Sequence, residues 1–306
     1  MTTTKAEPYW VESEDWHTAG EPFRIVAKLP PGHETEGKTV EERRLNIMAK
    51  PDHHLDVLRR SLCHEPRGHA DMYGGFIIPP NDAGALFDVL FWHKDGFSTA
   101  CGHGTTALGH WAVAKGMDHK PIYAEFIQVA SYQWAKDLTV TLPSLSLDIK
   151  VDLVWSGAVY AGVDLAQIGL TIEPANHDDF VQLGRGVKAP LGHEEDGARD
   201  EDGIVRQRNV VFFADGQIDR SPCGSGTCSR LAVLLSQGRV GAGQGKLTHR
   251  GIVGTPFEAD VVSEEPSPVD GLKACIPRVR GHANLVGEMR FFKDPSETVF
   301  PGFLFR

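Results

Sequence analysis

Hydrophobic and polar residues follow two kinds of pattern along this chain. Most segments have the alternation or short apolar runs of strands, and three have apolar residues at the spacing of about 3.6 that predicts helices. Helices are predicted over 54–63, 105–115 and 227–237, and Gly116 and Gly238 follow the last two as C-cap residues would. Short apolar runs between turn residues predict strands at 26–29, 45–48, 76–78, 87–92, 123–129, 138–142, 147–153, 155–161, 210–213, 257–262, 272–279 and 289–292. We therefore expect an α/β (α+β) fold in which strands outnumber helices.

The segment 193–203 interrupts this pattern. It is acidic and punctuated by glycine, which predicts a solvated surface loop. Its acidic residues lack the spacing and the closing glutamate of an EF-hand calcium loop.

A short motif occurs twice and organises the chain. Cys-Gly-x-Gly-Thr begins at Cys101 and again at Cys223, and each copy continues as an apolar helix that ends at a glycine. A hydrophobic strand and an Asp-Gly turn precede each copy. We interpret the repeat as two pseudo-symmetric domains whose equivalent elements face each other across a cleft. The first would span 1–150, with a C-terminal segment of about 290–306 returning to it, and the second 151–289.

Both repeated cysteines stand where a glycine-rich turn enters a helix. The unpaired N–H groups and the dipole of a helix start bind carboxylates, and they can lower a thiol pKa from ~8.5 into the range of about 3.5–7.5. Two such thiols around one carboxylate favour one reaction: a thiolate removes the α-proton of an amino acid, and a thiol returns a proton to the opposite face. This chemistry requires no pyridoxal cofactor.

Composition narrows the class of protein. The 306 residues carry a formal net charge of −10, which argues against a nucleic-acid partner because such a protein needs a basic face. No apolar run approaches the ~20 residues of a membrane span, and the beginning of the chain lacks the apolar core of a signal peptide. The 5 cysteines are too few and too irregular for a disulfide framework. We expect a cytoplasmic protein with no membrane partner.

Other uses of these motifs fit less well. The glycines lack the Walker lysine and the full dinucleotide fingerprint, and neither Cys223 nor Cys228 belongs to a zinc-ligand pattern, so no metal is expected. A Cys–His protease would leave the second motif unexplained. We expect the remaining cysteines to be packing residues, namely Cys63, Cys228 and Cys275.

The chain resembles the proline racemase family, which includes hydroxyproline 2-epimerases and trans-3-hydroxy-L-proline dehydratases. The resemblance is carried by Cys101-Gly-His-Gly104 and Asp219-Arg-Ser-Pro-Cys-Gly-Ser-Gly226, with support from segments 17–22, 65–72 and 251–255. It implies a fold like that of diaminopimelate epimerase, in which two half-barrel domains each surround a helix and share a site between them. It also makes a homodimer plausible.

The resemblance further implies roles for individual residues. Cys101 and Cys223 would be the two acid/base groups. Backbone amides of Gly102, His103, Gly224 and Ser225 would hold the substrate carboxylate. His103 and Asp219 would contact the substrate nitrogen, and the pocket wall would include Tyr73, Ala100 and Phe213.

The retained pair of cysteines favours epimerisation, because dehydratases of this family typically have Thr or Ser in place of one of them. Ala100 stands where proline racemases commonly have Met, and the Tyr73 hydroxyl could bind a ring substituent. These features favour 4-hydroxyproline as the small-molecule substrate, whereas Phe213 resembles the wall of a proline racemase. A dehydratase of trans-3-hydroxy-L-proline, or a non-catalytic binder of an imino acid, remains the alternative.

Overall fold

A computed structural model describes residues 7–117, 123–142, 146–187, 190–195, 202–213 and 216–304. The chain forms two compact units. The first contains Met1–His17, Pro22–Lys120 and Ala283–Arg306, and the second contains Thr18–Glu21 and Pro121–His282.

The expected boundary after residue 150 is therefore wrong. Strands β6 (Ala124–Ile127) and β7 (Ser131–Leu142) both pair with β15 (Ala274–Gly281), and β7 also pairs with β8 (Leu147–Trp155). These backbone hydrogen bonds place the segment in the second unit. The return of the chain to the first unit begins at Ala283, a few residues before the expected position.

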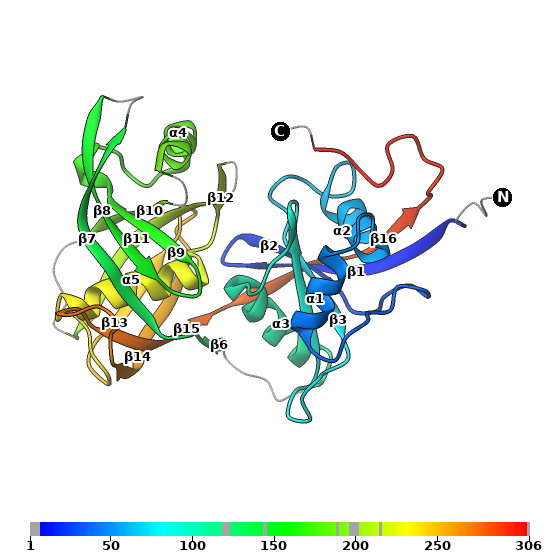
Figure 1. Cartoon of the computed structure of the whole chain (residues 1–306), viewed down its shortest axis with the longest axis horizontal. Coiled ribbons are helices and arrows are strands. Elements are labelled where there is room, and N and C mark those ends of the chain that lie inside the picture. Colours follow the sequence, from blue (N-terminus) through cyan, green and yellow to red (C-terminus); the bar gives the residue numbers. More distant parts are fainter. Residues whose placement is uncertain are drawn as a thin grey trace. The chain divides into compact units, whose positions relative to one another are not determined.

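The first unit has a sheet with helices on both faces. Within the described residues its six strands run in the order β16-β1-β2-β3-β4-β5. The strands are β1 (Tyr9–Thr18), β2 (Glu21–Val26), β3 (Gly74–Ile78), β4 (Asp88–His93), β5 (Gly96–Phe97) and β16 (Ala283–Lys293). The helices are α1 (Val40–Met48), α2 (His54–Cys63) and α3 (Gly102–Ala114), shown with the sheet in Figure 1.

Alternation along the strands gives this sheet two apolar faces. Leu90 and Trp92 of β4 join the core formed with α2, whereas Val89 and Phe91 pack in the core that contains α3. Side chains two residues apart point to the same face, so one apolar strand serves both helical layers.

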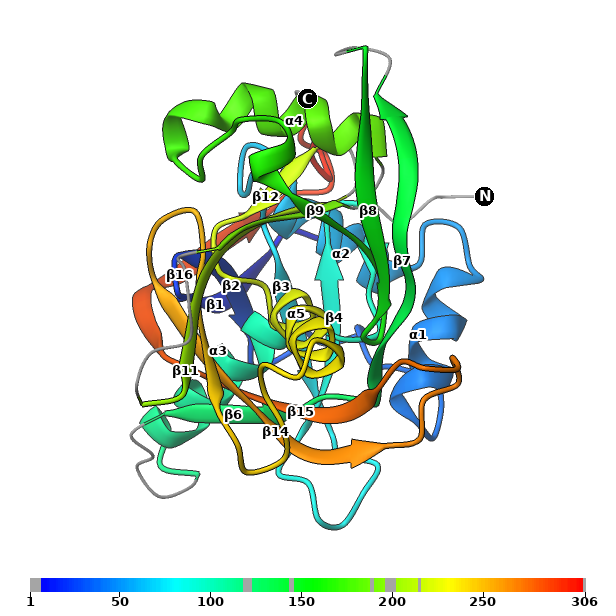
Figure 2. The same ribbon diagram turned by 90° about the vertical axis from the view of Figure 1, so that its left-hand side faces the viewer.

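The second unit is a sheet that closes around a helix. In its described part the order is β10-β9-β8-β7-β15-β14-β13-β11-β12, and β10 also pairs with β11. Figure 2 shows the strands running around α5 (Gly224–Ser236). The additional elements are β9 (Val159–Asp164), α4 (His177–Val187), β10 (Pro190–Glu195), β11 (Ile204–Phe213), β12 (Gln217–Asp219), β13 (Lys246–Arg250), β14 (Pro256–Glu265) and the 3₁₀ turns Leu165–Gln167 and Pro174–Asn176.

Helix α5 forms the core of its unit. Its side chains Leu231, Leu234 and Leu235 are fully buried against strand residues such as Leu247 and Phe257. The fold is thus α/β, as the sequence predicts, and each unit packs one helix that starts at a Cys-Gly-x-Gly motif against a sheet.

Several local predictions are wrong. Residues 45–48 end helix α1, which starts because the Thr39 hydroxyl caps it by accepting the N–H of Glu42. The strand expected at 26–29 lies earlier, in β2. Residues 193–195 belong to strand β10 and not to a loop, and residues 196–201 of the expected loop lie outside the described residues.

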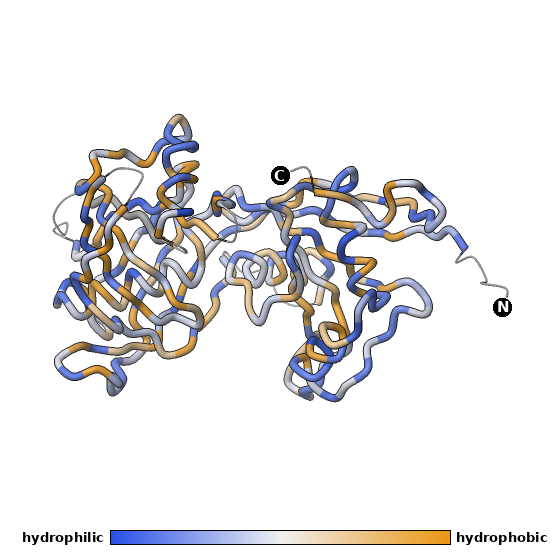
Figure 3. Tube along the Cα trace, turned by 45° about the horizontal axis from the view of Figure 1, so that its top comes forward, coloured by the Kyte–Doolittle hydropathy of each residue, from blue (hydrophilic) through white to orange (hydrophobic). Residues whose placement is uncertain are grey.

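Apolar and polar residues alternate closely along the trace (Figure 3). Among the described helices, none has both the length and the apolar character needed to cross a bilayer.

Candidate active site

Cys101 is the N-cap residue of α3. Its Sγ accepts a hydrogen bond from the backbone N–H of Gly104 at 3.3 Å, and its carbonyl oxygen accepts the N–H of Thr105 at 2.9 Å. The residue is only 8% exposed and packs in a core that includes Phe23 and Trp111. The partial positive charge of the helix start therefore acts directly on this sulfur.

A neutral imidazole lies beside this thiol. Both ring nitrogens of His103 lie 3.5 Å from Cys101 Sγ, and its ring makes edge contacts with Phe23 and Tyr73. Burial lowers the pKa of His103 to about 3, although a hydrogen bond with the Pro22 backbone acts in the opposite direction. His103 is therefore uncharged near neutral pH, and it can accept a proton or a hydrogen bond through only one nitrogen.

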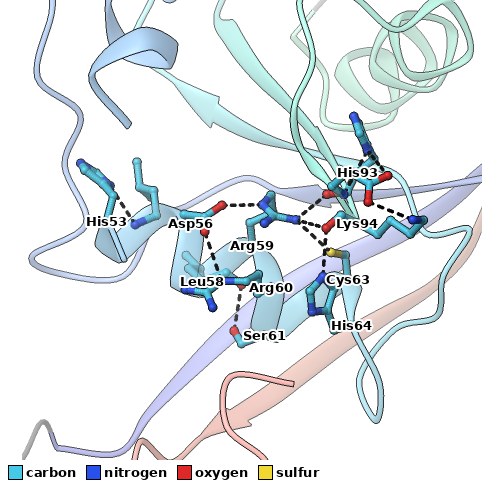
Figure 4. Close-up of polar contacts among 12 residues, drawn as sticks. His53, Asp56, Leu58, Arg59, Arg60, Ser61, Cys63, His64, His93 and Lys94 are labelled. Atoms are coloured by element: carbon cyan, nitrogen blue, oxygen red, sulfur yellow. Dashed lines mark hydrogen bonds and ion pairs between the residues drawn. The ribbon is translucent and has the colours of Figure 1, made fainter. Parts of the chain in front are cut away.

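One buried arginine fastens the strands that lead to Cys101 onto helix α2 (Figure 4). The Arg59 guanidinium donates to the carbonyl oxygens of His93 and Lys94, each at 2.6 Å, and forms an ion pair with Asp56 at 2.8 Å. These carbonyls belong to the turn between β4 and β5, after which the chain enters the Cys101 motif. Charge-assisted bonds of this kind hold the turn that precedes the Cys101 motif against helix α2.

Cys223 is the N-cap residue of α5, in the second unit. Its Sγ accepts the N–H of Gly226 at 3.4 Å, as Cys101 does from Gly104. Its backbone has φ 58° and ψ 127°, a left-handed conformation that costs a non-glycine residue on the order of 1–3 kcal/mol. The preceding residue is held firmly, because the Pro222 carbonyl accepts hydrogen bonds from Asn209 at 2.6 Å and from the Thr227 hydroxyl at 3.1 Å.

Ser221 connects the backbone of Cys223 to a buried carboxyl. Its hydroxyl accepts the N–H of Cys223 at 3.0 Å and donates to Asp219 Oδ1 at 2.7 Å. Burial raises the pKa of Asp219 to about 6, and the hydrogen bonds from Ser221 oppose this increase. Asp219 is therefore mostly ionised at neutral pH.

The same carboxyl affects the neighbouring thiol. Burial, and then the charge of Asp219, raise the pKa of Cys223 to about 12, despite the hydrogen bond from the Gly226 amide. The sequence predicts a lowered thiol pKa at this helix start, and for Cys223 that prediction is wrong. Burial first, and then the charge of the Asp219 carboxylate, oppose the thiolate more strongly than the Gly226 amide favours it.

A phenol and a hydroxyl complete the surroundings of Cys223. Tyr160 Oη lies 2.5 Å from Ser225 Oγ and 3.7 Å from Cys223 Sγ. Ser225 Oγ itself lies 3.9 Å from the sulfur. Tyr160 comes from β9, Ser225 from α5 and Asp219 from β12, so three separate elements surround this thiol.

The residues predicted to line a pocket have different environments. Tyr73 is half-buried, and its hydroxyl donates a hydrogen bond to Ser98 Oγ at 3.1 Å. The hydroxyl that we expected to bind a ring substituent therefore already has a partner within the protein. Ala100 is exposed directly before Cys101. Phe213 is half-buried at the end of β11, where it pairs with Gln217 of β12.

The predicted site residues therefore form two groups, one in each unit. The first contains Tyr73, Ala100, Cys101, Gly102 and His103, and the second contains Phe213, Asp219, Cys223, Gly224 and Ser225. The other three cysteines, Cys63, Cys228 and Cys275, are fully buried, as the sequence predicts.

Sequence reasoning missed three residues around Cys223. Ser221 and Glu21 lie within the motifs that carry the family resemblance, so those motifs held a signal for them. The Glu21 carboxylate accepts the backbone N–H of Arg220 at 2.8 Å. Tyr160 lies in an ordinary strand pattern, and no motif singles it out.

Comparison with known sequences shows the protein family of this chain. The sequence pattern of proline racemase matches residues 14–123 and 118–304. The chain belongs to the proline racemase family. It is 34% identical to a trans-3-hydroxy-L-proline dehydratase of Bacillus thuringiensis, over 95% of this chain and 96% of that protein. It is also 34% identical to a 3-hydroxyproline 2-epimerase of Burkholderia multivorans, with the same coverage.

A solved structure supports the fold assignment of this proline racemase family member. The hydroxyproline epimerase of Agrobacterium vitis, crystallised with bound trans-4-hydroxy-L-proline, superposes with a TM-score of 0.80 over 96% of this chain and 94% of that one. Its sequence is 23% identical, so this likeness concerns the fold.

Proposed function

We propose that this chain is a cofactor-independent 2-epimerase of a hydroxyproline and that Cys101 and Cys223 are its two acid/base groups. The observation that carries the proposal is the matched placement of the two thiols. Each caps a helix, and each sulfur accepts the N–H of the glycine three residues later. A reaction that inverts a carbon needs one proton acceptor and one proton donor, and two equivalent thiols can exchange these roles.

The proposed cycle uses one thiolate and one thiol. The Cys101 thiolate removes the α-proton, the Cys223 thiol gives a proton to the opposite face of the same carbon, and the reverse direction exchanges the two. The raised pKa of Cys223 suits the role of donor in the resting enzyme. The helix-start amides of Gly102, His103, Gly224 and Ser225 would hold the carboxylate, whose charge increases as the α-carbanion forms.

The remaining polar groups would hold the substrate nitrogen. Asp219, ionised above about pH 6, would attract the ammonium, and neutral His103 would accept one of its hydrogens. The relatives favour a hydroxyproline, and the one named an epimerase acts on the 3-hydroxy compound. Ala100 leaves room for a ring hydroxyl, so trans-3- and trans-4-hydroxy-L-proline are the two substrates to compare.

Proton NMR in D₂O tests the proposal. Wild-type protein is incubated with L-proline, trans-3-hydroxy-L-proline and trans-4-hydroxy-L-proline, and we expect the α-proton of a hydroxyproline to be lost while signals of its 2-epimer grow. Cys101→Ser and Cys223→Ser should each reduce this rate by at least 10²-fold. Cys275→Ala is the control, because Cys275 is a buried packing residue. Full epimerisation by either serine variant would reject the two-thiol mechanism.

A dehydratase is the second candidate, favoured by the Bacillus relative. Removal of the α-proton and departure of the 3-hydroxyl as water would give a cyclic enamine, which becomes a cyclic imine when the nitrogen loses a proton and C3 gains one. The same spectra distinguish the two, since elimination consumes 3-hydroxyproline and yields pyrroline signals without the epimer. A dehydratase also needs only one of the two thiols, so one serine variant would remain active.

A further inference from the structure

The surroundings of Cys223 contain a conflict. Asp219, buried on β12, opposes the thiolate form of Cys223 through its negative charge. In the proposed cycle Cys223 must nevertheless accept a proton in one direction, and it must then exist as a thiolate. Hydrogen bonds from Gly226, Tyr160 and Ser225 all lower the pKa of Cys223, yet burial and Asp219 keep it at about 12. The thiolate therefore depends on every donor that reaches this sulfur.

We infer that Tyr160 is a positioning residue that stabilises the thiolate of Cys223 by donating a hydrogen bond to Sγ, and that Ser225 supports its phenol. Tyr160 Oη lies 3.7 Å from Sγ, within the range of hydrogen bonds to sulfur, and 2.5 Å from Ser225 Oγ. The Ser225 hydroxyl can donate to Oη while Oη donates to Sγ, so that the two hydroxyls act in series. When Cys223 is a thiol, the phenol can rotate its hydrogen to Ser225.

The charges around the sulfur agree with this direction of donation. Burial and the nearby Cys223 and Asp219 raise the pKa of Tyr160 well above its usual value, so the phenol keeps its proton. The hydrogen bonds from Tyr160 and Ser225 lower the pKa of Cys223, against burial and Asp219. Two other groups face this cluster: Arg220 lowers the pKa of Asp219, and Cys228 of α5 is a buried thiol that interacts with Cys223.

The inference rests on the proposed function for its role in turnover, but the hydrogen bond can be measured without turnover. Iodoacetamide alkylates thiolates, and mass spectrometry of the digested protein gives the rate at Cys223 and at Cys101 separately. Rates are measured from pH 6 to 10 in the wild type and in Tyr160→Phe, which removes only the hydroxyl. Tyr132→Phe, at a half-buried tyrosine of β7 in the same unit, is the matched control.

We expect Tyr160→Phe to raise the pKa of Cys223 by about one unit, which slows its alkylation about tenfold at each pH below that pKa. Alkylation of Cys101 should change less than twofold, as should both rates in Tyr132→Phe. Ser225→Ala should slow alkylation of Cys223 in the same direction. Because Ser225 acts mainly through the phenol, the double variant should be slowed by less than the product of the two single effects.

An unchanged Cys223 rate in folded Tyr160→Phe would overturn the inference, and so would equal slowing of both cysteines. Circular dichroism confirms folding, and Ser225→Ala carries the test if Tyr160→Phe does not fold. The hydroxyproline assay of the wild type is read separately. A protein that shows the Cys223 shift but epimerises nothing would keep the hydrogen bond and reject the proposed function.

Discussion

The carboxylate of Glu21 accepts a hydrogen bond of 2.8 Å from the backbone N–H of Arg220, which lies 199 residues further along the chain. Glu21 is 1% exposed and belongs to the same unit as Arg220. The contact joins two of the segments that carry the family resemblance and fixes the backbone between Asp219 and Cys223. A residue near the beginning of the chain thus holds the approach to the second thiol.

Glu21→Ala should therefore destabilise the protein and weaken its activity together. Loss of the acceptor leaves a backbone donor without its charged partner, which costs about 1–3 kcal/mol of unfolding free energy. Urea unfolding measures this change, and Glu12→Ala is the control because its exposed ion pair with Arg290 should contribute less than about 1 kcal/mol. Equal stability of the two variants would show that Glu21 does not support the loop.

Asp219 should set the acid limit of activity. Its pKa is raised to about 6, so the carboxyl loses its charge, and with it the attraction for a substrate ammonium, as the pH falls through 6. We expect kcat/KM of the wild type to decrease about tenfold per pH unit below that point. Asp219→Asn should lower kcat/KM at least tenfold at pH 7.5 and remove this acid limb.

The control for this pH profile is Asp152→Asn. Asp152 is another carboxyl whose pKa burial raises, but it lies on β8 and accepts the N–H of Asp137. Its variant should keep the wild-type profile. An acid limb near pH 6 that persists in Asp219→Asn would assign that titration to another group.

Sequence reasoning located the two helix starts because a repeated Cys-Gly-x-Gly motif before an apolar run has a local cause, and helices α3 and α5 begin directly after Cys101 and Cys223. It missed α4, whose Gly184 and Gly186 weaken helix propensity, while Phe180 and Leu183 supply the burial that forms it. It also missed Tyr160, since only the pairing of β9 within the closed sheet brings that phenol to Ser225. Local signals predict elements, and contacts between distant elements require the fold.

Lys293 should make stability increase with pH in the alkaline range. It is fully buried on β16, and its Nζ donates to the carbonyl oxygen of Ser61. Burial, and then the charges of Arg67 and Arg24, lower its pKa to about 6. Between that value and the unfolded value of ~10.4, only the unfolded chain binds the proton, so the unfolding free energy rises by about 1.4 kcal/mol per pH unit.

Lys293→Met should remove this slope, which urea unfolding at pH 6.5, 7.5 and 8.5 would reveal as a difference from the wild type that grows with pH. Lys28→Met, at an exposed lysine that follows β2, should run parallel to the wild type. Parallel curves for Lys293→Met would mean that Lys293 keeps its proton in the folded protein.

Gly104→Ala should disable the first thiol without removing it. A Cβ at Gly104 would lie 2.4 Å from the Phe23 ring and 2.9 Å from Cys101 Sγ, and Phe23 is fully buried, so the methyl group must displace the sulfur or the helix start. The N–H of Gly104 is also the donor to that sulfur, at 3.3 Å. We therefore expect a loss of at least tenfold in epimerisation and overpacking that costs about 1–3 kcal/mol of unfolding free energy.

The comparison variant is Gly186→Ala, in helix α4. There the added Cβ would meet only the end of the Leu142 side chain, at 3.3 Å, and alanine favours the helix by about 0.5–1 kcal/mol. It should leave activity unchanged and stability within that range of the wild type. The methyl group added in Gly104→Ala can fit only if Cys101 Sγ and the start of helix α3 move apart. Full activity and stability of Gly104→Ala would therefore show that the contact between Gly104 and Cys101 does not position the thiol.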